Sequence, residues 1–121
     1  MTDDFIARFE AGTLRKEEWT HAAHLRMASW YVARFSPEDA GIRIRRGIRH
    51  LNECLGGENT DSSGFHETLT EFWIRIVRAN AGIDFTLLPS GLWKEYYSAD
   101  LPKDRESRLR FVEPDLKPIK A

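Results

Sequence analysis

Hydrophobic residues recur along this chain every three or four positions, the period of an α-helix that buries one face. The pattern predicts a short helix over residues 3–11 that ends at Gly12, a residue type favoured at helix ends. A first long helix is expected over about residues 13–35, with Thr13 as its cap and Pro37 beyond its end. Because Lys16, Arg26 and Arg34 mark only a narrow side of this helix for solvent, we expect most of it to lie inside the molecule.

Two further long helices are predicted, separated by a polar loop. The second helix should run from Pro37 to Gly56-Gly57, because proline is favoured in a first helical turn and glycine after a last one. The glycine-rich residues 56–64 predict the loop, and the third helix should follow over residues 65–80 with Ser62 or Ser63 as its cap. The apolar stripe of the second helix is Ala40, Ile44, Ile48, Leu51 and Leu55. The charge ladder of the third helix is Glu67, Glu71, Arg75 and Arg78.

The chain after the third long helix predicts shorter elements. These are a helix near residues 92–97, another over about 104–111, and an extended tail from residue 112, because Pro114 and Pro118 oppose helix formation. No segment predicts a β-sheet. We therefore expect a single helical domain over residues 1–121 of the all-α class. Its expected architecture is an up-down bundle of three long helices with short flanking helices and an extended C-terminal tail.

Composition excludes several kinds of function. Hydrophobic residues make up 41% of the chain and charged residues 31%, so a packed core is expected. The net charge of −1 argues against nucleic-acid binding, although Arg43, Arg45, Arg46 and Arg49 make one helix side basic. No apolar run approaches the ~20 residues of a membrane span, so we expect no membrane partner and a cytoplasmic location. The single cysteine, Cys54, can form no intramolecular disulfide.

Three of the four histidines lie in two short stretches of the predicted helices. His21 and His24 are three residues apart, so they share a face of a helix. His66 falls at the start of the third long helix, from which it could reach the same point in a bundle. Three neutral imidazoles in an apolar bundle commonly hold a transition metal with one position left for water. The spacing therefore predicts a three-histidine metal site.

Such a site would hold a divalent transition metal, with zinc or iron as the first candidates, because nitrogen ligands disfavour magnesium and calcium. Water bound to the metal would become a nucleophile, and Glu67 or Glu17 could act as its general base. The expected chemistry is that of a hydrolase or lyase acting on a small molecule. Thr20 and Thr70 could supply hydrogen bonds to the site, and Tyr31 shares the histidine face of its helix, so these three are candidate ligand-contacting residues.

Two other interpretations of the histidines stay open. They could act as acids, bases or hydrogen-bonding groups in a metal-free pocket for a small molecule. They could also form a structural seam, satisfied by threonines, carboxylates or backbone carbonyls, in a non-enzymatic module that binds a ligand or another protein. A second copy of so short a chain could complete the pocket, so a homo-oligomer is compatible with each interpretation.

Four motifs occur in one order along the chain. They are Trp19-Thr20-His21-x-x-His24-Leu25, Phe65-His66-Glu67-Thr68-x-Thr70-x-Phe72-Trp73, Tyr96-Tyr97-Ser98 and Phe111-Val112-Glu113-Pro114-Asp115-Leu116. With these motifs the chain, from Gly12 onward, resembles a family of small bacterial helical proteins of uncharacterised activity that carry WTHxxHL, a YHET-like motif and a terminal VEPDL. The resemblance implies no particular reaction, but its motifs carry over onto His21, His24, His66, Glu67 and Thr70. The chain departs from the pattern at Phe65, where the family has tyrosine, so that hydroxyl has no counterpart here.

Overall fold

The computed structural model of this protein describes residues 4–82, 84 and 87–119. Within them the regular elements are all helical, and no β-strand is present, which confirms the all-α fold class. The α-helices are α1 (Asp4–Ala11), α2 (His21–Arg34), α3 (Pro37–Cys54), α4 (Glu67–Ala79) and α5 (Arg105–Leu109). The 3-10 helices whose bounds fall within the described residues are η1 (Lys16–Glu18), η3 (Leu92–Glu95) and η4 (Leu101–Lys103). None of these described helices is both long and apolar enough to cross a membrane.

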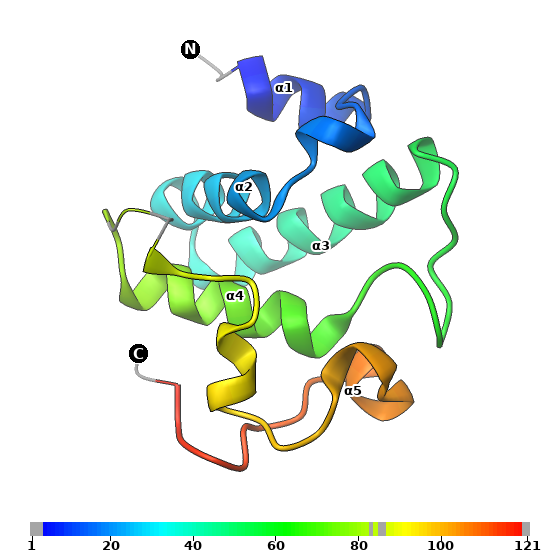
Figure 1. The fold of residues 1–121 in the computed structure, drawn as a ribbon. Coiled ribbons are helices and arrows are strands. Elements are labelled where there is room, and N and C mark those ends of the chain that lie inside the picture. The colour runs from blue at the N-terminus through cyan, green and yellow to red at the C-terminus, as the bar shows by residue number, and fades with distance from the viewer. Residues whose placement is uncertain (1–3, 83, 85–86, 120–121) are drawn as a thin grey trace.

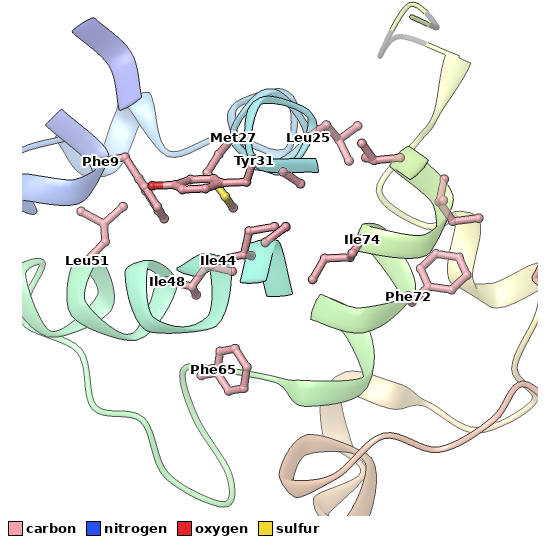
Figure 2. Close-up of a cluster of buried hydrophobic side chains, with 14 of the residues drawn as sticks. Phe9, Leu25, Met27, Tyr31, Ile44, Ile48, Leu51, Phe65, Phe72 and Ile74 are labelled. Carbon is pink, nitrogen blue, oxygen red and sulfur yellow. The ribbon is translucent and has the colours of Figure 1, made fainter. Parts of the chain in front are cut away.

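The three longest helices, α2, α3 and α4, pack against one another at the centre of the molecule (Figure 1). The short helix α1 packs on α3 at one side, and α5 packs on α4 at the other. One hydrophobic cluster joins these helices; in Figure 2, Phe9 of α1 lies beside Tyr31 of α2 and close to Leu51 of α3. All three side chains are at most 1% exposed, so removal of apolar surface from water stabilises this arrangement.

Helix α2 begins at His21 and not after Thr13, so the predicted start of the first long helix is wrong. The N-cap is Thr20, whose extended backbone precedes the helix and whose hydroxyl accepts a hydrogen bond from the amide of Ala23 at 3.2 Å. This cap makes His21 the first residue of the helix.

The residues before this cap form the separate helix η1, which is stabilised by the carboxylate of Glu18. Glu18 accepts hydrogen bonds from the guanidinium of Arg8 at 2.5 and 2.9 Å and from the backbone amide of Arg15 at 2.9 Å. The Arg8 hydrogen bond is the main cause that lowers the pKa of Glu18 to about 2. Glu17 and Glu18 therefore belong to this turn, and not to the first long helix, whose predicted range includes them.

Helix α3 follows the prediction closely, with Ser36 as its N-cap, Pro37 in its first turn and its last residue at Cys54. Four residues of its predicted stripe are buried, but Leu55 lies beyond the helix and is 36% exposed. The predicted stripe is therefore one residue too long.

The charge ladder predicted on α4 forms only in part. Arg75 donates to Glu71 at 2.8 Å, as the spacing predicts. Glu67 instead accepts from Arg45 of α3, with both carboxylate oxygens within 3.1 Å, and Arg45 also donates to Glu71 at 2.6 Å. Burial raises the pKa of Glu71, but the hydrogen bonds from Arg75 and Arg45 outweigh it, so the pKa of Glu71 is lowered. These ion pairs join α3 to α4.

The segment that follows α5 lies along α4 and has no regular secondary structure of its own through residue 119. The buried hydroxyl of Thr68 in α4 donates to the carbonyl of Arg110 at 2.9 Å and accepts from the amide of Val112 at 3.0 Å. The hydroxyl of Tyr97 donates to the carbonyl of Val112 at 2.7 Å, and the amide of Leu116 donates to the carbonyl of Tyr96 at 2.9 Å. Side-chain hydroxyls thus replace part of the backbone pairing that a helix or sheet would provide.

Candidate functional site

A cavity of about 500 Å³ lies between α2, α3 and α4. Its wall is mainly apolar and includes no aspartate, glutamate, lysine or arginine. In Figure 2, Ile44, Ile48, Phe65 and Ile74 lie around this space. The lining residues are Trp19, His21, His24, Met27, Ala28, Ile44, Ile48, Asn52, Gly64, Phe65, His66, Leu69, Thr70, Trp73 and Ile74. The predicted site residues His21, His24, His66 and Thr70 therefore share one cavity.

His24 presents one hydrogen-bonded nitrogen and one open nitrogen. Its Nδ1 lies 2.7 Å from the backbone carbonyl of Thr20, and since a carbonyl can only accept, Nδ1 carries the proton. Among the described residues no partner reaches Nε2, and none of their buried side-chain nitrogen or oxygen atoms lacks a partner, so Nε2 lies open. Burial lowers the pKa of His24 despite the Thr20 hydrogen bond, which favours the neutral ring. The ring stacks on Trp19 with their centroids 3.7 Å apart.

His21 has the complementary arrangement of ring nitrogens. Its Nε2 donates to the backbone carbonyl of Leu88 at 2.7 Å, so in the neutral ring Nδ1 keeps a lone pair. The ring packs edge-on against Trp73, with centroids 4.7 Å apart. His21 and His24 together place two hydrogen-bond acceptors near the start of α2.

His66 is the N-cap of α4, a role that the sequence pattern assigned to Ser62 or Ser63. Its Nδ1 accepts a hydrogen bond from the amide of Leu69 at 3.1 Å, and its Nε2 donates to the carbonyl of Leu101 at 2.6 Å. The side chain is buried, and burial lowers the pKa of His66 although the Leu101 hydrogen bond opposes the shift. Both ring nitrogens of His66 are therefore engaged by the backbone.

This arrangement bears directly on the predicted three-histidine metal site. A metal ligand must offer a lone pair, and the one on His66 is used by the Leu69 amide. Within residues 4–82, 84 and 87–119, no group of three or more histidine, cysteine, aspartate or glutamate side chains is placed to hold a metal ion. A three-histidine site would require His66 to give up the hydrogen bond from the Leu69 amide, and with it the N-cap of α4.

The two glutamates predicted as general bases lie outside the cavity wall. Glu67 binds Arg45 through both oxygens, and Glu17 is exposed on η1, where its nearest ionic partner is Arg15 at 3.7 Å. Glu17 therefore does not lie one helical turn before His21, because α2 begins only at His21.

Thr20 and Tyr31, predicted to contact a ligand, are occupied elsewhere. The hydroxyl of Thr20 caps α2, and the hydroxyl of Tyr31 donates to Glu10 at 2.6 Å. Burial, together with the hydrogen bond to Glu10, raises the pKa of Tyr31 well above its usual range. Neither side chain lines the cavity, whereas Thr70 does.

Asn52 also lines the cavity, although helical spacing alone does not identify it as a functional candidate. The feature of the sequence that points to it is a polar residue next to the apolar stripe of a helix. Its Nδ2 donates to Oδ1 of Asn59 at 3.1 Å, and that same oxygen accepts from the amide of Phe65 at 3.0 Å. These bonds fix the orientation of the Asn52 amide, so its carbonyl oxygen is the atom left without a partner among the described residues.

The loop between α3 and α4 reaches the cavity at Gly64. Its φ of +79° lies in the left-handed region, which favours glycine. A Cβ atom here would lie 2.3 Å from the carbonyl oxygen of Glu58 and 2.7 Å from Oδ1 of Asn59. The loop can therefore close against the cavity only with glycine at this position.

Comparisons with protein-family models, curated protein sequences and solved structures found no match to this chain. The resemblance to the bacterial helical family therefore stays a prediction, and the function must be inferred from the site itself.

The free energy of unfolding is expected to fall as the pH is lowered from about 7 to about 5.5. The pKa values of His24 and His66 are lowered by burial, so the unfolded chain, with histidine pKa values near ~6.5, binds more protons than the folded one. The free energy of unfolding therefore rises with pH through this window, and the contribution of the two histidines is lost as the pH falls through it. Urea unfolding at both pH values measures the difference.

The matched control is a double variant, His24→Gln with His66→Asn, which should lose less stability over the same interval. Lowered carboxylate pKa values, such as that of Glu18, act only at lower pH. Equal losses in the parent and the double variant would contradict the assignment to these two histidines.

Proposed function

We propose that this protein binds a small, uncharged, mainly apolar molecule in the cavity between α2, α3 and α4. The observation that carries the proposal is the combination of a volume of about 500 Å³ with a lining that holds no charged side chain. Small-molecule sites are typically apolar clefts of roughly 300–1,000 Å³ with a few polar groups. The cavity is open to solvent on one side, so a bound molecule would remove its apolar lining from water, which favours binding.

In this proposal the protein is a non-enzymatic ligand-binding module, in which the three long helices form the bundle that holds the cavity. His21 and His24 supply polar contacts, and His66 holds the start of α4 in place. Neither glutamate predicted as the base of a metal-dependent hydrolase or lyase lines the cavity, whereas its volume and apolar wall suit binding directly. The binding function is therefore the better supported of the two.

The proposal predicts that N-phenyl-1-naphthylamine, an uncharged fluorescent probe, binds this protein saturably with a 1:1 stoichiometry. Ala28 is 3% exposed and lines the cavity, so Ala28→Leu places three more carbon atoms in it and should weaken binding about tenfold or more. Ala22, on the same helix, is exposed and lies outside the lining, so Ala22→Leu is the matched control and should bind like the parent. Fluorescence titration gives the three dissociation constants.

Thermal unfolding of the same samples shows whether the two variants fold. A parent that does not bind the probe, or an Ala28→Leu variant that is folded and binds it as well as the parent, would contradict the proposal.

A transition metal bound by His21 and His24 is the second candidate, favoured by the open ring nitrogen that each of them keeps. Elemental analysis of the purified parent and of a His21→Ala variant separates it from the first. Stoichiometric zinc or iron in the parent and none in the variant would favour the metal.

A further inference from the structure

We propose that the molecule bound in this cavity donates a hydrogen bond to Nε2 of His24, so that its chemical class is an uncharged aromatic compound with an N–H or O–H group. This inference rests on the proposed binding function and specifies the ligand of the same site. It follows from the hydrogen bonds that polar side chains of the wall already form.

The backbone fixes which atoms of the wall remain open. The proton-bearing nitrogens of His24 and His21 donate hydrogen bonds to backbone carbonyl oxygens, and the amide nitrogen of Asn52 donates to the side-chain oxygen of Asn59. In the two histidines and Asn52, the acceptors left open are two imidazole lone pairs and one amide oxygen, beside the second N–H of the Asn52 amide. A bound molecule that leaves such acceptors unpaired and removes them from water would bind less well than one that supplies a donor.

His24 is the strongest of these three anchors. Its neutral form is favoured by burial, and an imidazole nitrogen is a better acceptor than an amide oxygen. The side-chain donors in the wall are the hydroxyl of Thr70, the indole N–H groups of Trp19 and Trp73 and the second N–H of Asn52, none of which is charged. The wall therefore offers no counter-ion, and a neutral donor fits it better than an ammonium group or a carboxylate.

The rings beside the acceptors determine the shape of ligand that fits. Trp19 stacks on His24, and Trp73 packs against His21, so flat aromatic surfaces flank both open nitrogens. Apolar side chains such as Met27 and Ile48 continue the wall away from them. A flat ring system with one N–H or O–H on its edge would place its faces against these aromatic rings and its donor near an open nitrogen.

The test compares two isomers, 3-methylindole and 1-methylindole, by isothermal titration calorimetry. They have the same atoms and nearly the same shape, but methylation at the ring nitrogen removes the only donor. We expect 3-methylindole to bind about five- to tenfold more tightly to the parent. In His24→Phe, which keeps an aromatic ring against Trp19, the ratio of the two dissociation constants should fall to about one through weaker binding of 3-methylindole. His50→Phe, an exposed histidine outside the lining, is the control and should keep the parent ratio.

The outcomes separate the two proposals. No binding of either isomer at millimolar concentration would overturn the binding function itself. Equal binding of both isomers to the parent, which needs no variant, would overturn the donor requirement while leaving the binding function intact. A preference for 3-methylindole that persists in folded His24→Phe would overturn the assignment to His24.

Discussion

Replacing His66 with alanine is expected to lower the free energy of unfolding by about 1.5–2.5 kcal/mol. The substitution removes the N-cap of α4, since no other side chain accepts the amide of Leu69. It also removes the donor that now lies 2.6 Å from the carbonyl of Leu101, which keeps only the amide of Asp104 at 3.1 Å. A lost cap costs ~1 kcal/mol and a lost hydrogen bond about 0.5–1.5 kcal/mol. Urea unfolding followed by circular dichroism measures the sum.

His66→Asn is the matched variant, because asparagine is a good N-cap but is too short to reach Leu101 in the same way. It should recover about 1 kcal/mol of the loss. If His66→Ala unfolds at the same urea concentration as the parent, His66 is not a structural residue, and the hypothesis that it serves as a metal ligand gains weight.

Replacing Thr68 with valine is expected to cost about 2–3 kcal/mol, although the two side chains have nearly the same shape. Thr68 is 0% exposed, and its hydroxyl pairs with both the carbonyl of Arg110 and the amide of Val112. Valine cannot form hydrogen bonds, so both backbone groups lose their partner at once. Urea unfolding gives the loss, and limited proteolysis should show earlier cleavage near residue 112.

Thr68→Ser is the control for this prediction. It keeps the hydroxyl and removes only one methyl group, so its loss should be about 1 kcal/mol. A valine variant that is as stable as the serine variant would show that the segment after α5 is held by its apolar contacts rather than by this hydroxyl.

The parts of the fold that the sequence predicts well are those fixed by neighbouring residues. Helix α3 starts at Pro37 because proline suits a first turn and Ser36 caps it, and α1 ends before Gly12, whose φ is +73°. Both signals act within a few positions, so they can be read without knowledge of the rest of the molecule.

The start of α2 and the cap of α4 differ from the prediction because contacts between distant residues decide them. Thr13 and Thr20 are equally good caps by residue type, but the ion pair between Arg8 and Glu18, ten positions apart, closes a separate turn between them. His66 is a weaker cap by type than either serine before it. Its second hydrogen bond, to Leu101, lies 35 positions away and holds the ring in the capping position.

The candidate site shows the same division. The spacing of His21 and His24 predicts a shared face, and the structure places both in one cavity wall. The orientation of Glu67 could not be predicted, because its partner Arg45 lies on another helix, 22 positions earlier. Which imidazole nitrogens stay open depends on the carbonyls of Thr20 and Leu88, and only the first of these is close in the sequence.

The tripeptide Gly64-Phe65-His66 has a consequence for sequence divergence. Each of its three positions meets a separate physical demand: a left-handed backbone at Gly64, an apolar wall at Phe65, and a cap that also holds Leu101 at His66. Residues 60–63 of the preceding loop are exposed and meet none of these demands. Distant relatives should therefore differ freely across those four residues and keep a glycine, a bulky ring and a histidine directly after them. These three consecutive positions are therefore a more selective search pattern for homologues than the spacing of the histidines.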